Sequence, residues 1–153
     1  MIRVVRGTDS REETIALGRA LGERLRGGEI LSLVGSLGAG KTQFVKGLAA
    51  GLGVPDADRT VTSPTFVLLA IHHGRLPLYH FDAYRLSGAE DFEWTFGGDF
   101  LSAGGVAAIE WADRVAGFLP GDALEIAFRV TSEYEREIEI AGNDRWAGIL
   151  AGI

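Results

Sequence analysis

The residues best suited to chemistry are eight consecutive ones, Gly35-Ser36-Leu37-Gly38-Ala39-Gly40-Lys41-Thr42. They fit G-x-x-x-x-G-K-[ST] at every fixed position, the pattern of a phosphate-binding loop. The glycines let the backbone curl until successive N–H groups point into one concavity, where the diphosphate of a nucleotide fits. We expect Lys41 to reach the β- and γ-phosphates, and the Thr42 hydroxyl to give one oxygen to Mg²⁺.

The segments on either side of this loop have the required character. Residues 29–34 are typical of a short buried strand, and residues 43–52 carry apolar side chains at helical spacing before Gly53. A dinucleotide-binding pattern would need G-x-G-x-x-G, and the chain from Gly38 lacks the last glycine. The remaining alternative, a glycine-rich turn with an incidental lysine, is disfavoured by the strand–loop–helix order.

Two carboxylates end predicted strands and are candidates to act beside the loop. The apolar run 106–109 ends in Glu110, and a sheet can place such an acid next to the Mg²⁺ of a phosphate loop. The strand 76–82 ends in Asp82, which could serve the metal shell, position a water or act as a base. An Asp that ends a strand is often only a cap. Glu93 repeats the Glu-Trp dipeptide, but in polar, helical surroundings.

Three further sites carry weaker signals. The loop 62–65 offers the hydroxyls of Ser63 and Thr65, which could sense a γ-phosphate and its Mg²⁺ or merely cap a proline-marked turn. Arg136 is predicted to lie near the nucleotide, with an exposed cross-strand ion pair as the alternative. The adjacent histidines of residues 72–75 are predicted to lie in a solvated hairpin turn rather than to bind a metal.

Composition limits the class of protein. With 153 residues and 46% hydrophobic content, residues 1–153 are expected to form a single globular domain. No cysteine is present, which excludes a disulfide framework and a thiolate zinc site. The net charge of −6 and the dispersed 15 Lys and Arg argue against broad nucleic-acid binding, so any contact with RNA is expected through a partner. No apolar run could span a membrane and no signal peptide is recognisable, which indicates a cytoplasmic protein.

The elements that must hold these residues indicate an α/β fold. The segment Ser10–Glu13 fits a capping box before an amphipathic helix that is predicted to end at Gly27-Gly28. Alternating segments predict a hairpin over 124–130 and 134–140, and a short helix is predicted within 143–153. We predict a three-layer sandwich like that of phosphate-loop NTPases. Its mixed sheet would have a parallel pair at the centre, helices on both faces and antiparallel hairpin strands at its edges.

Four motifs together carry a resemblance to a known family. In chain order they are Gly35-x-Leu37-Gly38-Ala39-Gly40-Lys41-Thr42, Ser63-Pro64-Thr65-Phe66, His80-Phe81-Asp82-Ala83-Tyr84-Arg85-Leu86 and Ile109-Glu110-Trp111. The chain resembles the bacterial tRNA threonylcarbamoyladenosine biosynthesis ATPase family, TsaE (also called YjeE), over nearly its whole length. It departs at Ser36, where many members carry an acid, and at Ala112, where a proline is common.

The resemblance implies a Mg²⁺-dependent ATPase that assists formation of threonylcarbamoyladenosine in tRNA, with the TsaD and TsaB subunits as partners. Lys41, Asp82 and Glu110 would then be the catalytic residues. Two other activities fit a phosphate loop: a small-molecule kinase, and an adaptor that binds a nucleotide without hydrolysing it. The kinase is disfavoured because segment 88–105, where a lid would lie, contains no Arg or Lys.

Overall fold

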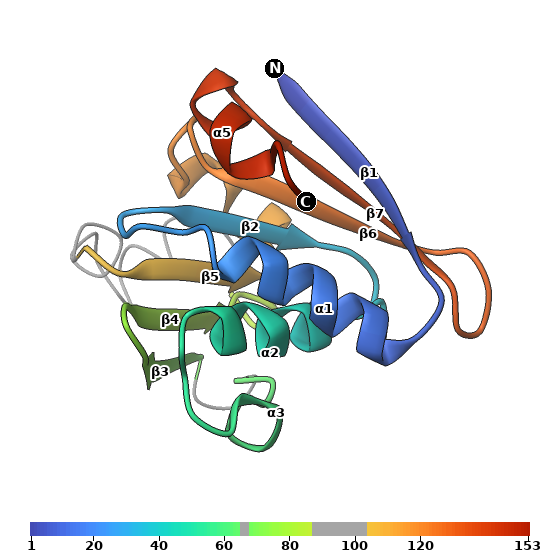
Figure 1. Ribbon diagram of the computed structural model, residues 1–153, viewed down its shortest axis with the longest axis horizontal. Coiled ribbons are helices and arrows are strands. Elements are labelled where there is room, and N and C mark those ends of the chain that lie inside the picture. The colour runs from blue at the N-terminus through green and yellow to red at the C-terminus, as the bar shows by residue number, and fades with distance from the viewer. Residues whose placement is uncertain (65–67, 87–103) are drawn as a thin grey trace.

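The computed structural model describes residues 1–64, 68–86 and 104–153. One seven-stranded sheet with the strand order β1-β7-β6-β2-β5-β4-β3 forms its centre (Figure 1). Thr65, and Glu93 with the helical surroundings predicted for it, lie outside the described residues. The strands are β1 (Ile2–Thr8), β2 (Ile30–Val34), β3 (Leu69–His73), β4 (Pro77–Asp82), β5 (Val106–Glu110), β6 (Leu124–Val130) and β7 (Arg136–Gly142).

The sheet is mixed, as predicted, but its parallel part is wider than the predicted pair. Strands β4, β5, β2 and β6 are all parallel. Strand β3 pairs antiparallel with β4 at one side, and at the other side β7 pairs antiparallel with β6 and β1 antiparallel with β7. The difference arises because the inner strand of each predicted hairpin also pairs with the parallel centre. Parallel strands end at the same edge of a sheet, which is where open α/β sheets bind ligands.

Apolar side chains cover both faces of the sheet. Along β2 the side chains alternate, so that Leu31 and Leu33 belong to one buried cluster and Ile30 to another. Helices α1 (Arg11–Gly22) and α2 (Lys41–Gly51) pack on the first face (Figure 1). The short 3-10 helix η2 (Ala112–Phe118) contributes Ala112 and Val115 to the cluster on the other face. The predicted layers, helices on both faces of a mixed sheet, are confirmed.

Helix α1 begins as predicted and ends earlier. Ser10 is its N-cap and accepts a hydrogen bond from the Glu13 amide at 3.1 Å, while the Glu13 carboxylate accepts from the amide of Asp9 rather than of Ser10. The helix stops at Gly22, not at Gly27-Gly28. Leu25 is buried all the same, because the chain beyond the helix still packs on the core. A buried apolar residue at helical spacing was therefore misleading evidence for helix length.

The histidines at the end of β3 correct another prediction. His72 and His73 belong to the strand and pair with Leu78 and Pro77. His73 is exposed, but His72 is half-buried, and loss of solvent lowers the pKa of its imidazole. Two short helices lie elsewhere. Helix α3 (Ala57–Thr60) precedes the loop 62–65, and α5 (Ala147–Leu150) follows the 3-10 turn η3 (Asp144–Trp146) within the segment 143–153 where a short helix was predicted.

Helices α1 and α2 touch through glycines. Gly18 and Gly22 on α1, and Gly47 and Gly51 on α2, are each spaced by four residues and so lie on one face of their helix. A Cβ atom built on Gly47 would lie 1.9 Å from the Ile15 carbonyl oxygen, and one on Gly18 would lie 2.2 Å from that of Phe44. The backbones therefore approach too closely for any side chain. This contact fixes the helix that follows the phosphate loop.

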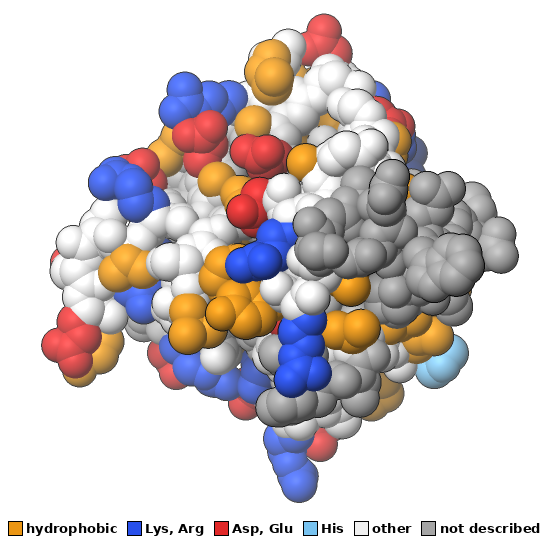
Figure 2. All heavy atoms as spheres, turned by 180° about the vertical axis from the view of Figure 1, so that it is seen from behind, with side chains coloured by type: hydrophobic (Ala, Val, Ile, Leu, Met, Phe, Trp, Pro, Cys, Tyr) orange, Lys and Arg blue, Asp and Glu red, His pale blue; other side chains and the backbone are white. Residues whose placement is uncertain are grey.

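The molecular surface is mixed in charge. On the face seen in Figure 2, Lys and Arg side chains are interspersed with Asp and Glu, and a group of hydrophobic side chains lies near the centre. Every helix within the described residues is too short or too polar to cross a membrane.

The glycine contact predicts an uneven cost of Gly→Ala substitution. We expect Gly47→Ala to lower the free energy of unfolding by about 3 kcal/mol, at the upper end for overpacking, because the new methyl group meets rigid backbone. Gly148 in α5 has no atom within 4 Å of an added Cβ, so Gly148→Ala serves as the control and should be neutral or slightly stabilising. Urea denaturation followed by circular dichroism measures both. Equal effects of the two substitutions would contradict the close helix contact.

Candidate functional site

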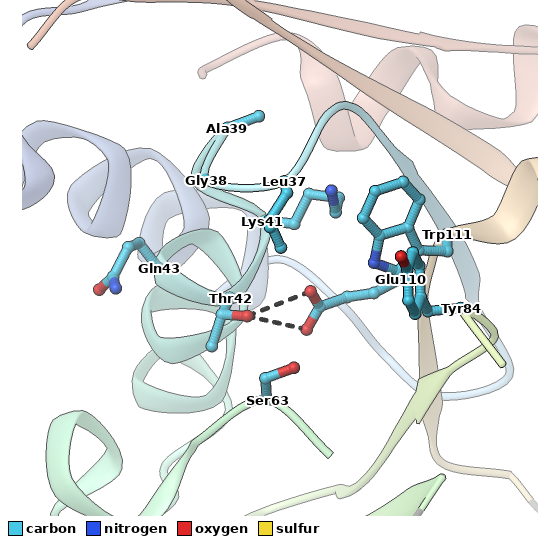
Figure 3. Close-up of a pocket in the computed structure, with 11 residues that line it drawn as sticks. Leu37, Gly38, Ala39, Lys41, Thr42, Gln43, Ser63, Tyr84, Glu110 and Trp111 are labelled. Carbon is cyan, nitrogen blue, oxygen red and sulfur yellow. Dashed lines mark hydrogen bonds between the residues drawn. The ribbon is translucent and has the colours of Figure 1, made fainter. Parts of the chain in front are cut away.

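The glycine-rich loop joins the end of β2 to the start of α2 and forms one wall of a cavity. Gly38 and Gly40 have φ angles of 77° and 105°, in the left-handed region that favours glycine. The cavity has a volume of about 370 Å³ (Figure 3). Its lining residues are Leu37, Gly38, Ala39, Gly40, Lys41, Thr42, Gln43, Ser63, Tyr84, Glu110 and Trp111. A curled loop followed by a helix N-terminus is suited to hold an anion.

Glu110 and Thr42 meet at the inner end of this cavity. In the sheet register Leu33 of the loop strand lies opposite Glu110, so the acid at the end of β5 is placed beside the loop. The Thr42 hydroxyl lies 3.1 Å from each oxygen of the Glu110 carboxylate (Figure 3). A hydroxyl next to a carboxylate is a donor set that suits Mg²⁺, which prefers oxygen ligands. The pair therefore fits the metal role expected for both residues.

Lys41 is folded back onto its own loop. Its Nζ donates to the carbonyl oxygens of Gly35 at 2.5 Å and Ser36 at 2.9 Å, and lies 3.9 Å from the centroid of the Trp111 ring. Burial lowers the pKa of the ammonium, and the nearby carboxylates of Glu110, Asp82 and Asp113 oppose that shift. The Lys41 ammonium is thus stabilised by two carbonyl oxygens and an aromatic ring in place of water. A bound phosphate could replace these contacts.

Asp82 lies one strand further along the same edge. It is the register neighbour of Glu110, it is buried, and it is not among the residues that line the cavity. Its carboxylate accepts from the Tyr84 amide at 2.9 Å and from the Ser63 hydroxyl at 3.2 Å. Because Ser63 does line the cavity, it connects Asp82 to the space in front of the loop. The cap that was the alternative for Asp82 is present, alongside the contact with Ser63.

Arg136 joins the phosphate loop to the β6–β7 hairpin. Its guanidinium donates to the Gly38 carbonyl at 3.2 Å and to the carbonyls of Ser132, Glu133 and Glu135. It also borders a second hollow of about 240 Å³ on that side of the loop. The residues around this hollow are Ser10, Arg11, Thr14, Gly38, Gly40, Gln43, Glu133, Tyr134 and Arg136. The structure therefore brings Arg136 to the loop.

Three side chains of this site belong to motifs named in the sequence, but no role was predicted for them. Tyr84 and Trp111 pack together at 4.9 Å between ring centroids and form the aromatic side of the cavity. His80 donates from β4 to Glu110 and is buried beside it. A usable signal existed for His80, because it precedes Asp82 by two residues in a strand and must share its face. Tyr84 and Trp111 follow strand ends, where no periodicity predicts direction.

The carboxylates alone do not make a metal centre. Among residues 1–64, 68–86 and 104–153, no group of three His, Cys, Asp or Glu side chains is placed to hold an ion. A Mg²⁺ bound at Thr42 and Glu110 would need further oxygens, which phosphate groups and water can supply. The site is thus suited to a metal that arrives with a nucleotide.

Comparison with known proteins gives consistent relatives. The family model described as "Threonylcarbamoyl adenosine biosynthesis protein TsaE" matches residues 8–138. The TsaE protein of Treponema pallidum is 46% identical over 132 residues, covering 86% of this chain and 96% of that protein. The TsaE protein of Bacillus subtilis is 41% identical over 129 residues, or 83% of this chain and 78% of that protein. The crystal structure of YdiB from Bacillus subtilis superposes with a TM-score of 0.79 at 31% identity, covering 97% of this chain and 91% of that one.

The contact between Lys41 and Trp111 predicts an optical signal. A phosphate held by the loop should draw the Lys41 ammonium away from the indole, so we expect Mg·ADP to change the intrinsic fluorescence of Trp111. When Mg·ADP is titrated into the protein, the Trp111→Phe variant should lose most of this fluorescence change. Trp146→Phe is the control, because Trp146 is buried in the core near the C-terminus, and it should keep the change. A full response in Trp111→Phe would refute this prediction.

Proposed function

Because this chain belongs to the TsaE family of threonylcarbamoyl adenosine biosynthesis proteins, we propose that it is a Mg²⁺-dependent ATPase. The family takes part in forming threonylcarbamoyladenosine in tRNA, and we propose that hydrolysis acts on the transferase complex of TsaB and TsaD subunits. The observation that carries the proposal is the Thr42 hydroxyl 3.1 Å from both Glu110 oxygens at the end of a complete phosphate loop.

Nucleotide binding follows from the loop. The backbone N–H groups of residues 35–42 would hold the phosphates, together with the positive end of helix α2. Lys41 would exchange the carbonyls of Gly35 and Ser36 for phosphate oxygens. The ribose and base have room in the hollow beside Gly38, where Arg136 would then lie next to the nucleotide.

Hydrolysis needs a metal and an oriented water. Thr42 and Glu110 would hold Mg²⁺, and that ion would neutralise the charge that develops on the β- and γ-phosphate oxygens. Asp82 would orient the attacking water or accept its proton. It would do so from behind the Ser63 hydroxyl, which donates a hydrogen bond to it. Thr65 stays a prediction as a γ-phosphate sensor.

The surface supports contact with proteins rather than directly with RNA. The net charge is −6, and basic side chains are interspersed with acidic ones on the face in Figure 2, so no broad phosphate-binding field is seen there. We therefore propose that tRNA is reached only through the partner complex, in the cytoplasm.

Phosphate release tests the proposed activity. We expect the chain to hydrolyse Mg·ATP slowly alone and faster with the TsaB–TsaD complex, and Lys41→Ala to abolish turnover while the protein stays folded. Lys46→Ala is a matched control, because Lys46 also lies on α2 but bonds the Asp58 carbonyl away from the loop. Binding without turnover would indicate the adaptor, and a phosphorylated metabolite the kinase. Normal hydrolysis by folded Lys41→Ala would refute the assignment of the loop.

A second experiment separates the two acids. Glu110→Ala should raise the Mg²⁺ concentration needed for ATP binding, because the metal loses its protein carboxylate. Asp82→Ala should bind Mg·ATP nearly normally and turn over about 10²- to 10⁴-fold more slowly, the usual contribution of a general base. Titration of Mg²⁺ against ATP binding for both variants measures the difference. The opposite pattern would mean that the two carboxylates have exchanged roles.

A further inference from the structure

Glu110 is held from two sides, and one of its partners is a buried histidine. The Nε2 atom of His80 lies 2.5 Å from Glu110 Oε2, whereas the Thr42 hydroxyl approaches both carboxylate oxygens at 3.1 Å. His80 is completely buried, and Glu110 is 3% exposed. In the parallel register His80 pairs with Ala108 and Asp82 with Glu110, so the ring reaches the carboxylate diagonally across one face of the sheet.

The imidazole directs its hydrogen bonding to this carboxylate. Among the described residues, His80 Nδ1 has no hydrogen-bond partner although it is buried. A carboxylate only accepts hydrogen bonds, so Nε2 donates to it, and the buried Nδ1 is left without a partner, which costs free energy. A leucine could fill the space without that cost, as Leu78 does two residues earlier on the same face. Packing alone therefore does not explain a histidine at this position.

The terminal torsion of a glutamate is broad, so a carboxylate at a strand end needs partners to fix its plane. The hydrogen bond from His80 to Oε2 fixes that plane from the sheet side, and in the resulting orientation both carboxylate oxygens lie 3.1 Å from the Thr42 hydroxyl at the cavity wall. We propose that His80 is a positioning residue that sets the orientation of Glu110 for Mg²⁺. The inference rests on the proposed function, because it presupposes that Glu110 serves a metal. Hydrogen-bond partners behind a metal ligand typically contribute 10- to 100-fold in metal affinity.

Two polar variants test whether the hydrogen bond to Glu110 must come from the position of His80 Nε2. The amide nitrogen of a glutamine reaches about the position of imidazole Nε2, and that of an asparagine about the position of Nδ1. We expect His80→Gln to keep the Mg²⁺ midpoint for ADP binding within about threefold of wild type, and His80→Asn to raise it about 10- to 100-fold. Calorimetric titration of ADP at a series of Mg²⁺ concentrations gives the midpoints. Binding of ADP in EDTA should be the same for both variants, because it does not involve Glu110.

A control variant and the wild-type protein separate a failure of the positioning role from a failure of the proposed function. Leu78→Val disturbs the same face of β4 without touching Glu110 and should leave the midpoint unchanged. If wild-type protein binds ADP with no dependence on Mg²⁺, the proposed function fails and this inference with it. If the wild type depends on Mg²⁺ but His80→Gln and His80→Asn share one midpoint, or Leu78→Val shifts it as much as His80→Asn, the positioning role alone is overturned.

Discussion

The parallel pairing of β2 with β5 is the constraint on which the site depends. It sets Leu33 opposite Glu110, so that the strand leading into the phosphate loop and the strand ending in the acid finish side by side. The Thr42 hydroxyl can then reach the carboxylate from the first turn of α2. A register shift of one residue would turn Glu110 to the other face of the sheet. The surrounding fold holds this register and the position of α2.

Buried polar groups at this edge would be costly if they did not meet one another. Lys41, Asp82, Glu110 and His80 are all buried, and each has a polar or charged partner. Asp82 and Glu110 end neighbouring parallel strands, at the edge of the sheet beside the phosphate loop. The glycine contact between α1 and α2 fixes one side of this arrangement, and the bond from Arg136 to Gly38 ties the loop to the hairpin on the other. A folded scaffold thus presents carbonyls, hydroxyls and carboxylates that a metal-bound nucleotide can engage.

Much of this could be predicted from the sequence because local signals sufficed. The loop motif, the strand before it, the apolar run ending in Glu110 and the mixed sheet with hairpin edges all have short-range patterns, and the structure contains each of them. What failed depended on long-range packing. The end of α1 was misplaced because Leu25 is buried by tertiary contacts outside the helix, and His72 was assigned to a turn because strand length depends on its partner β4. The contact of His80 with Glu110 joins residues thirty apart in the chain, so only the strand order reveals it.

The central claim is that Thr42 and Glu110 form the metal side of a nucleotide site. Crystals grown with Mn²⁺ and a non-hydrolysable ATP analogue test it directly, because manganese scatters anomalously. We expect an anomalous peak bonded to the Thr42 hydroxyl, with Glu110 bound to the metal directly or through one water. We also expect the Lys41 ammonium on phosphate oxygens instead of on the carbonyls of Gly35 and Ser36. A peak elsewhere, or a bound nucleotide with Lys41 still folded onto its own loop, would contradict it.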